Sequence, residues 1–569
     1  MKIFTVLSFI LFFSVNALSQ IPTWSWAKNV AYGTYLPGSN GRANRSEFVD
    51  GQGNIYVATS YRDKVYLDTD SLVTPTITTY GIFIVKYNTD GNLVWKKSGN
   101  CSNIQSYIGT TGLYGDNNGK LYLSYYFVDT LNYDGNNIIE TTGDNLGSLQ
   151  VMSVNTSDGS FNWSTEVAPK YNGTSQLGVN PSGEAIVAYM NIQTPAQDTF
   201  GITTLSNSGV KSLERKYLLG TYSYFNVKAI GTTGSNIFIV GTYTNNFTLA
   251  GQAFTTSNTD YILARFDNTG ALTWSGGGKS TGSPITEIGN ITEDANGNFY
   301  YCGSFTGTLS VLGTSQTLLS TGKGSGTPNE LMYAKYSSNG SLVWLKQGQG
   351  EKSQFAKIIR IGVDNKLYMM GRLGSKKMFL GGDSTDVVGI NNTAPYYVAQ
   401  LDTSGNCQWL KRVNNTGSIQ GNTNMFVDNS SNIYFAGAYD NTGIPIEPFT
   451  LPTIFSNKVF YAKTTDLATP NGVRILPTNE LPVTCTLEQN YPNPFNPTTT
   501  LAFDTPVSGF VSLKVYDISG REVAILVNQI VTAGKYEAIF DASGLASGVY
   551  FSRLLAGNFV QTRKIVLQK

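Results

Sequence analysis

The sequence predicts an all-β protein, and three observations lead to this fold class. Gly (60), Tyr (34) and Phe (29) are abundant among the 569 residues and only 14% are charged, which is typical of strands joined by tight turns. One unit of strands and turns recurs along most of the chain. Beyond residue 467, a stretch rich in proline leads into a second series of short strands. We therefore expect a large repeat domain followed by a small β-sandwich.

The repeated unit has two recognisable halves. The first is a turn followed by a strand, as in residues 50–57, and its key position returns at residues 56, 122, 186, 238, 300, 368 and 434. The second is a tight turn with a glycine and a tryptophan four residues later, as in Gly91 and Trp95. In the first copy we expect strands at 44–50, 54–61, 81–88 and 92–97. Seven four-stranded units of this size are typical of a seven-bladed β-propeller.

The seventh unit lacks its tryptophan strand, and a matching strand occurs at the other end of the chain. Residues 22–28 resemble residues 93–97, so we expect them to complete the last blade of a propeller that covers residues 20–466. Such closure would remove an open sheet edge. One copy has Leu213 in the tryptophan position, and Trp24 lies outside it. We interpret the other tryptophans as packing residues between blades: Trp26, Trp95, Trp163, Trp274, Trp344 and Trp409.

The first 19 residues have the three regions of a secretory signal peptide. Lys2 precedes an apolar stretch at 3–15, and the small residues at 17–19 predict cleavage between Ser19 and Gln20. The alternative is an uncleaved N-terminal anchor. No later segment is apolar enough to span a membrane, so we expect a chain that is secreted or held at the outer cell surface after passing through the periplasm.

Several kinds of chemistry are excluded or unsupported. The chain contains no histidine, which excludes histidine-based catalysis and histidine metal ligands. Its net charge of +1, without a polybasic run, argues against binding to nucleic acid. The turn at 294–298 resembles part of a calcium loop but lacks the distal glutamate, so we interpret it as an ordinary turn. We assign no catalytic residue, cofactor or metal ligand. The sequence leaves the pairing of four cysteines open: Cys101, Cys302, Cys407 and Cys485.

A polar linker at 467–486 is expected to lead into a module at 487–569. Its short strands and turns are typical of an immunoglobulin-like β-sandwich. The prolines at 492, 494 and 497 disfavour helix and predict a stiff, extended entry segment. We expect Tyr491 and Phe495 to pack this segment onto the sandwich.

Four motifs of this module, at 487–497, 515–522, 540–550 and 563–569, occur in a fixed order. Together they resemble the C-terminal sorting domain of the type IX (Por) secretion system of Bacteroidetes. The resemblance implies that the outer-membrane secretion machinery recognises residues 487–569 and exports the chain. A sandwich without sorting activity is the alternative. The signature residues are Asn490, Tyr491, Pro492, Asn493, Pro494, Phe495, Asn496, Pro497, Gly520, Arg521, Gly548, Tyr550, Lys564 and Lys569.

Two classes of function remain for the propeller. The first is a non-catalytic binding or adhesion module for glycan or protein ligands. The second is an extracellular enzyme, acting on polysaccharide or as a quinoprotein-like dehydrogenase, and the unit at 267–274 resembles the repeats of quinoprotein-type propellers. A sugar-cleaving enzyme would need two carboxylates about 5–10 Å apart. We favour binding, because the sequence contains no motif for either enzyme.

Overall fold

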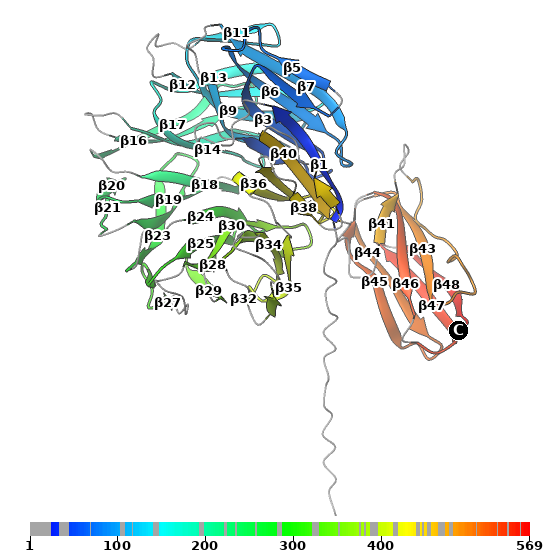
Figure 1. Cartoon of the computed structure of the whole chain (residues 1–569). Coiled ribbons are helices and arrows are strands. Elements are labelled where there is room, and N and C mark those ends of the chain that lie inside the picture. The colour runs from blue at the N-terminus through cyan, green and yellow to red at the C-terminus, as the bar shows by residue number, and fades with distance from the viewer. Residues whose placement is uncertain are drawn as a thin grey trace, which may run out of the picture.

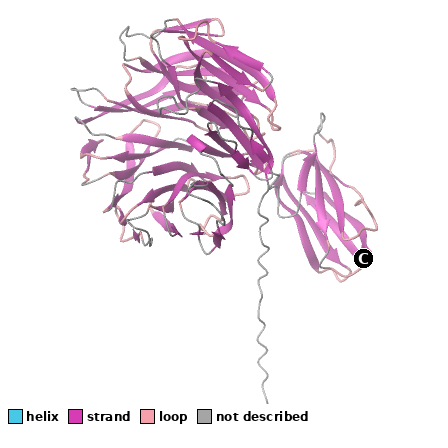
Figure 2. Cartoon of the chain, viewed as in Figure 1, coloured by secondary structure: helices cyan, strands magenta, loops and turns pink. Residues whose placement is uncertain are grey.

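The computed structural model of the chain consists of strands, turns and irregular segments, without a helix among the residues described (Figure 1, Figure 2). It describes residues 24–33 and 45–569, apart from 69, 103–107, 117, 140–146, 193–197, 221–224, 234–235, 257–258, 282–286, 321–328, 351–352, 375–376, 381–382, 387–395, 414–418, 440–443, 447–448, 452–456, 465–472, 477–481, 508, 532, 543–544 and 558. The predicted all-β class is confirmed. Within this described part, no helix could cross a membrane.

The described strands between residues 24 and 464 include seven antiparallel units of four strands. The first strands are β2 (Ser46–Val49), β8 (Ile108–Gly115), β14 (Gly173–Val179), β18 (Asn226–Thr233), β24 (Glu287–Glu293), β30 (Gln354–Ile361) and β36 (Ile419–Val427). The second strands are β3 (Ile55–Arg62), β9 (Lys120–Phe127), β15 (Ala185–Asn191), β19 (Asn236–Tyr243), β25 (Phe299–Phe305), β31 (Leu367–Leu373) and β37 (Ile433–Tyr439). The third strands are β6 (Tyr80–Tyr87), β12 (Ser148–Asn155), β16 (Asp198–Leu205), β22 (Asp260–Phe266), β28 (Glu330–Tyr336), β34 (Tyr396–Leu401) and β40 (Asn457–Thr464). The fourth strands are β7 (Leu93–Cys101), β13 (Phe161–Pro169), β17 (Lys211–Gly220), β23 (Leu272–Ser280), β29 (Leu342–Gly350), β35 (Cys407–Val413) and β1 (Trp24–Gly33).

In six units, the stretch between the second and third strands folds as a hairpin, which the sequence analysis did not predict. Four of these hairpins extend the sheet of a neighbouring unit, because β4 pairs with β1, β10 with β7, β26 with β23 and β32 with β29. Each of these four hairpins therefore covers a sheet edge that would otherwise be open. The hairpins are β4 (Lys64–Leu67) with β5 (Asp70–Val73), β10 (Thr130–Tyr133) with β11 (Asn136–Ile139), β20 (Phe247–Leu249) with β21 (Gln252–Phe254), β26 (Thr308–Val311) with β27 (Thr317–Leu319), β32 (Lys377–Leu380) with β33 (Asp383–Asp386), and β38 (Ile444–Ile446) with β39 (Phe449–Leu451).

The first strands of the units contact one another in cyclic order. β2 contacts β8, the series continues through β14, β18, β24, β30 and β36, and β36 contacts β2 again. Hydrogen bonds also cross between first strands, since Asn290 Oδ1 accepts from the Ile359 N–H at 2.6 Å. Apolar side chains of neighbouring units share buried clusters, such as Val57 of β3 with Tyr461 of β40. Neighbour packing therefore supplies the core that no single sheet could form alone.

The N-terminal strand β1 lies between β40 and β4, and Figure 1 shows it beside β40. Its register with β40 runs from the pair Trp24–Thr464 to the pair Gly33–Asn457. On the other side, Tyr32 pairs with Tyr66 of β4, and their rings stack 5.0 Å apart. Strands from the two ends of the repeat region therefore belong to one sheet.

The C-terminal module contains two antiparallel four-stranded sheets and one buried apolar cluster. One sheet has the order β41 (Val473–Leu476), β46 (Gly534–Asp541), β43 (Thr498–Thr505) and β42 (Thr486–Leu487). The other has the order β45 (Glu522–Val531), β44 (Gly509–Asp517), β47 (Gly548–Ala556) and β48 (Phe559–Leu567). Within the predicted linker at 467–486, the strand β41 pairs with β46. This pairing satisfies backbone groups that would otherwise form an open edge of β46.

Removing β1 should destabilise the repeat region, because β40 and β4 would each lose a hydrogen-bonded neighbour. We expect a chain that starts at residue 34 to unfold about 5 °C or more below a chain that starts at residue 20, measured by calorimetry. Equal melting temperatures would contradict a stabilising role for β1.

Candidate functional site

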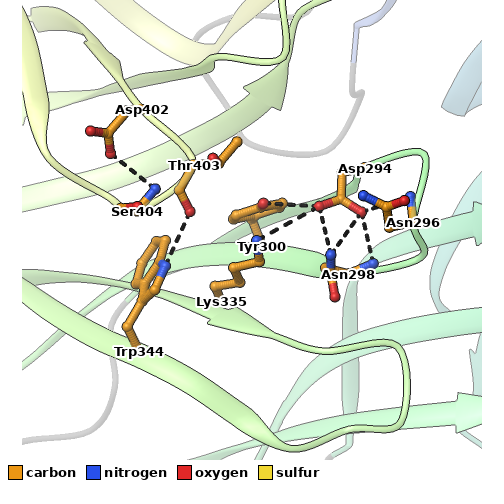
Figure 3. Close-up of polar contacts among 9 residues, drawn as sticks. All are labelled: Asp294, Asn296, Asn298, Tyr300, Lys335, Trp344, Asp402, Thr403 and Ser404. Carbon is orange, nitrogen blue, oxygen red and sulfur yellow. Dashed lines mark hydrogen bonds and ion pairs between the residues drawn. The ribbon is translucent and has the colours of Figure 1, made fainter.

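The turn before the second strand of a unit is organised around one aspartate, as Asp294 shows (Figure 3). Its Oδ1 accepts hydrogen bonds from the N–H groups of Asn296 and Asn298 at 3.0 and 2.9 Å. Its Oδ2 accepts from Asn298 Nδ2 at 2.9 Å and from Tyr300 Oη at 3.0 Å. These donors engage both carboxylate oxygens. The turn compared with a calcium loop is therefore closed by its own hydrogen bonds.

The aspartate–tyrosine pair recurs in other units. The distances from Tyr Oη to Asp Oδ2 are 3.2 Å for Tyr56–Asp50, 2.8 Å for Tyr368–Asp364 and 3.1 Å for Tyr434–Asp428. Burial raises the pKa of Asp428, against hydrogen bonds from Asn432 and Ser430 that lower it. Burial also acts to raise the pKa of Asp294, but hydrogen bonds from Asn298 and Tyr300 outweigh it and lower the pKa. Turns of the same type, in two different units, therefore hold carboxylates with opposite pKa shifts.

The repeated tryptophans lie against a turn of the next unit (Figure 3). Trp344 donates from Nε1 to the Thr403 carbonyl at 3.2 Å, and its ring centroid lies 6.1 Å from that of Tyr300. Asp402 closes the turn by accepting from the Ser404 N–H at 2.9 Å. Three other tryptophans make the same bond: Trp26 to Thr89 O at 3.2 Å, Trp95 to Thr156 O at 3.0 Å and Trp163 to Asn207 O at 3.0 Å.

The glycine of a Gly-x-x-x-Trp motif receives the tryptophan of the preceding unit, except at Gly270, where a Cβ would meet Arg215 and Leu213. Gly159 has a φ of 74°, and a Cβ there would lie 2.7 Å from the ring of Trp95. A Cβ on Gly340 would lie 2.5 Å from Trp274. One motif therefore serves two contacts, because its glycine admits one tryptophan while its own tryptophan reaches the following turn.

Two positions depart from this pattern. Where Leu213 replaces tryptophan, Arg215 Nε donates to the Thr269 carbonyl of the next turn at 2.9 Å. Trp409 is buried. In the unit next to it, no continuous turn follows β40, because the neighbouring strand β1 comes from the other end of the chain. Trp24 of β1 shares a buried cluster with Trp409. The tryptophan outside the repeat thus packs where no continuous turn is present.

A recurring contact between a cationic side chain and an aromatic ring was not predicted from the sequence. Lys335 Nζ lies 5.1 Å from the Tyr300 ring centroid and 3.8 Å from Asp294 Oδ2. Lys86 lies over the Tyr56 ring at 5.4 Å and donates to Thr156 O at 3.1 Å. A signal was present, since a cation precedes the turn glycine by five residues at Lys86, Arg265 and Lys335.

An ion pair at the beginning of β2 was also not predicted from the sequence. Arg45 Nε donates to Glu47 Oε1, and both side chains are almost fully buried. Burial raises the pKa of Glu47, against the lowering effects of Arg45 and of a hydrogen bond from Asn424. Glu47 lies on β2 and Asn424 on β36, so this contact joins the first and last units.

Possible metal ligands and thiols are dispersed. No group of three or more His, Cys, Asp or Glu side chains in the described ranges is suited to hold a metal ion. No disulfide joins the four cysteines, all of which lie in the described part of the chain, and Cys101 and Cys302 are buried. Burial, together with the Asp129 carboxylate, raises the pKa of the Cys101 thiol to about 12, so this thiol is unreactive at neutral pH.

The segment at 490–497 is fastened to the C-terminal strand of its module. The Phe495 N–H donates to Val566 O at 2.9 Å, and the Gln568 N–H donates to Phe495 O at 3.0 Å. Asn493 Oδ1 accepts from the Val566 N–H at 2.9 Å. Phe495 is buried as expected, but Tyr491 is 83% exposed, so the prediction that it packs onto the module was wrong. The two Tyr491 backbone bonds to Thr500 leave its side chain pointing outward.

The other signature residues are spread over the module. Asn490 is buried and donates to Pro492 O and Thr499 Oγ1, each at 2.9 Å. Tyr550 Oη donates to Ala546 O at 2.7 Å. Pro497 is half-buried. The remaining positions are exposed: Pro492, Pro494, Asn496, Gly520, Arg521, Gly548, Lys564 and Lys569. The predicted signal peptide, with Ser19 and Gln20, lies outside the described residues.

Residues 489–568 match the family described as the secretion system C-terminal sorting domain. The C-terminal module is a type IX secretion sorting domain. The resemblance inferred from its motifs is confirmed, and the chain is exported to the cell surface or secreted. The sorting domain accordingly interacts with the type IX secretion machinery.

Solved structures similar to the chain share little sequence with it. A mutant of the Synechocystis apocarotenoid oxygenase is 10% identical over 78% of this chain and 94% of its own, with a TM-score of 0.36. The plexin A4 extracellular region is 9% identical over 95% and 62%, with a TM-score of 0.36. A protein of unknown function from Dyadobacter fermentans is 11% identical over 64% and 96%, with a TM-score of 0.34. These scores are too low to support an argument. No curated protein matches the sequence.

A comparison of two glycines distinguishes the cost of a packing clash from the cost of backbone strain. Gly159 and Gly313 have φ values of 74° and 75°, but a Cβ at 313 meets nothing within 4 Å. We expect Gly313→Ala to cost roughly 1–2 kcal/mol of unfolding free energy. Gly159→Ala should cost about 1–3 kcal/mol more, because the methyl group meets Trp95. Equal costs in denaturant titrations would contradict the packing role of Gly159.

The two aspartate turns should respond oppositely to pH. The lowered pKa of Asp294 means that its carboxylate stabilises the fold at neutral pH, and this contribution is lost as the pH falls through that pKa. The raised pKa of Asp428 means that ionisation disfavours the fold as the pH rises above 3.8. Asp294→Asn should therefore cost more unfolding free energy near neutral pH than in acid. Asp428→Asn should cost less unfolding free energy near neutral pH than in acid. Urea unfolding in both conditions would test this, and parallel pH profiles would contradict it.

Proposed function

We propose that the exported chain is a seven-bladed β-propeller that binds a ligand without turning it over, carried by an immunoglobulin-like sorting domain. The cyclic order of contacts among the seven first strands supports the propeller. The placement of β1 beside β40 supports closure by the N-terminal strand. Two facing four-stranded sheets around one core support the immunoglobulin-like sandwich.

The observation that carries the binding proposal is the polar character of the first strands. In a propeller these strands surround the central axis, where ligands have access. Their partly exposed side chains include Thr111, Gln176, Asn290, Thr292 and Lys357. Amide, hydroxyl and ammonium groups of this kind suit a glycan or a polar protein surface. In contrast, several carboxylates of the repeat are engaged in turns, as at Asp294.

A second candidate function is an extracellular enzyme that acts on polysaccharide. Glu47 favours it, because a buried carboxyl with a raised pKa is suited to act as a general acid. Its partner Arg45 and the contact with Asn424 equally suit a structural link between units. The quinoprotein-like alternative has no comparable observation in its favour. We therefore rank binding first.

Screening the chain from residue 20 on a glycan array, with a parallel assay for released reducing sugars, separates these functions. We expect saturable binding without release. Gln176→Ala with Lys357→Ala should weaken binding about tenfold, whereas Lys211→Ala on the outer strand β17 should not. Sugar release that is lost in Glu47→Gln would contradict the binding proposal and support the enzyme.

A further inference from the structure

The outer face of the sheet β45-β44-β47-β48 in the sorting domain is arranged in cross-strand rows. Tyr516, Phe551 and Lys564 form one row, because Phe551 pairs with both of the others. Arg553 pairs with Lys514 and with Thr562 in the next row. Along β47, alternate residues are exposed and buried, so these side chains share the solvent face.

Four large apolar side chains are exposed on this face or beside it. Ile518 is 79% exposed, Val560 48%, Leu555 37% and Phe551 36%. On the opposite sheet, Lys535 and Ile539 are the exposed residues among the described side chains of β46, and Ile539 is the large apolar one. Apolar side chains gathered on one face are typical of an interaction site.

A depression of about 310 Å³ lies within this face. Its lining consists of Tyr516, Asp517, Ile518, Gly520, Phe551, Arg553 and Thr562. The depression therefore combines aromatic and aliphatic walls with the Arg553 guanidinium and with the Asp517 carboxylate, which Arg521 engages at 3.0 Å. Such a combination suits an apolar side chain that is followed by an anionic group.

The charges on this face are unevenly satisfied. Lys514 pairs with Glu522 at 2.9 Å, and Arg521 pairs with Asp517 at 3.0 Å. Hydrogen bonds from Ser519 and Arg521 lower the pKa of Asp517 to about 2, so it remains ionised and engaged. Over the described ranges, neither Arg553 nor Lys564 has an ion pair. The surplus charge of this face is positive.

We propose that this face docks an extended segment of the type IX secretion machinery that presents a carboxylate next to an apolar side chain. The carboxylate meets the Arg553 guanidinium, which can form two parallel hydrogen bonds with it. The apolar side chain packs between Ile518 and Phe551. The exposed Lys564 strengthens the attraction to an acidic partner. The segment at 490–497 then serves to fasten the module to β48 and is not itself the docking surface.

Export of the full chain from a host with a working type IX system tests the proposal. The measurement is the fraction of protein outside the cell, by fractionation and protease accessibility. A chain that ends at residue 466 provides the periplasmic reference. We expect Phe551→Ser with Arg553→Glu to reduce the exported fraction about tenfold or more, corresponding to at least about 1.4 kcal/mol of docking energy. Arg553→Lys should retain more export than Arg553→Glu.

A matched variant on the opposite sheet, Ile539→Ser with Lys535→Glu, makes the same kinds of change and should be exported normally. Equal loss in the two double variants would overturn the proposal, as would normal export of Phe551→Ser with Arg553→Glu. Melting temperatures of the purified full chains check folding. If the double variant is unfolded, Lys564→Glu replaces it, and normal export of that folded variant would overturn the proposal. Conversion of a dimer to a monomer by Arg553→Glu, with export unchanged, would show that the occupant is a second copy and would also overturn it.

Discussion

The packing of a tryptophan from one unit against a glycine turn of the next is the contact on which the repeat region depends. A four-stranded sheet has two faces and cannot bury both alone. The turn accepts a hydrogen bond from the indole, as Thr403 does from Trp344, and its glycine leaves room for the ring. Because one motif supplies both a glycine and a tryptophan, a unit that carries both, such as the one with Gly159 and Trp163, is fastened on both sides.

The ends of the repeat region require a different solution, because the chain is not continuous between β40 and β1. Here β1 pairs with β40, and Trp26 makes the usual bond to Thr89 of the first unit. Trp24 joins the cluster around Trp409, next to the interrupted connection. The contact between Glu47 and Asn424 adds a polar link between the same two units. Apolar packing, backbone pairing and contacts of a buried ion pair thus join the first and last units together.

The two parts of the chain use their polar groups differently. In the repeat region, carboxylates such as Asp294 are engaged within their own turns. These turns order the backbone. The sorting domain, in contrast, exposes Phe551 and Arg553 side by side along β47, where neither contributes to the core. A surface that does not stabilise its own domain is free to recognise another one.

The sequence by itself determined the all-β class, the repeat with its glycine and tryptophan spacing, and the sorting domain, because each leaves a local pattern. It also indicated that residues 22–28 match the fourth strand of a unit. The tertiary structure decided what those residues touch. That Gly159 receives Trp95, that β41 pairs with β46, and that Tyr491 is exposed while Phe495 is buried depend on residues far apart in the chain. Packing between distant segments leaves no periodic signal in a single sequence, and so these contacts became visible only in the fold.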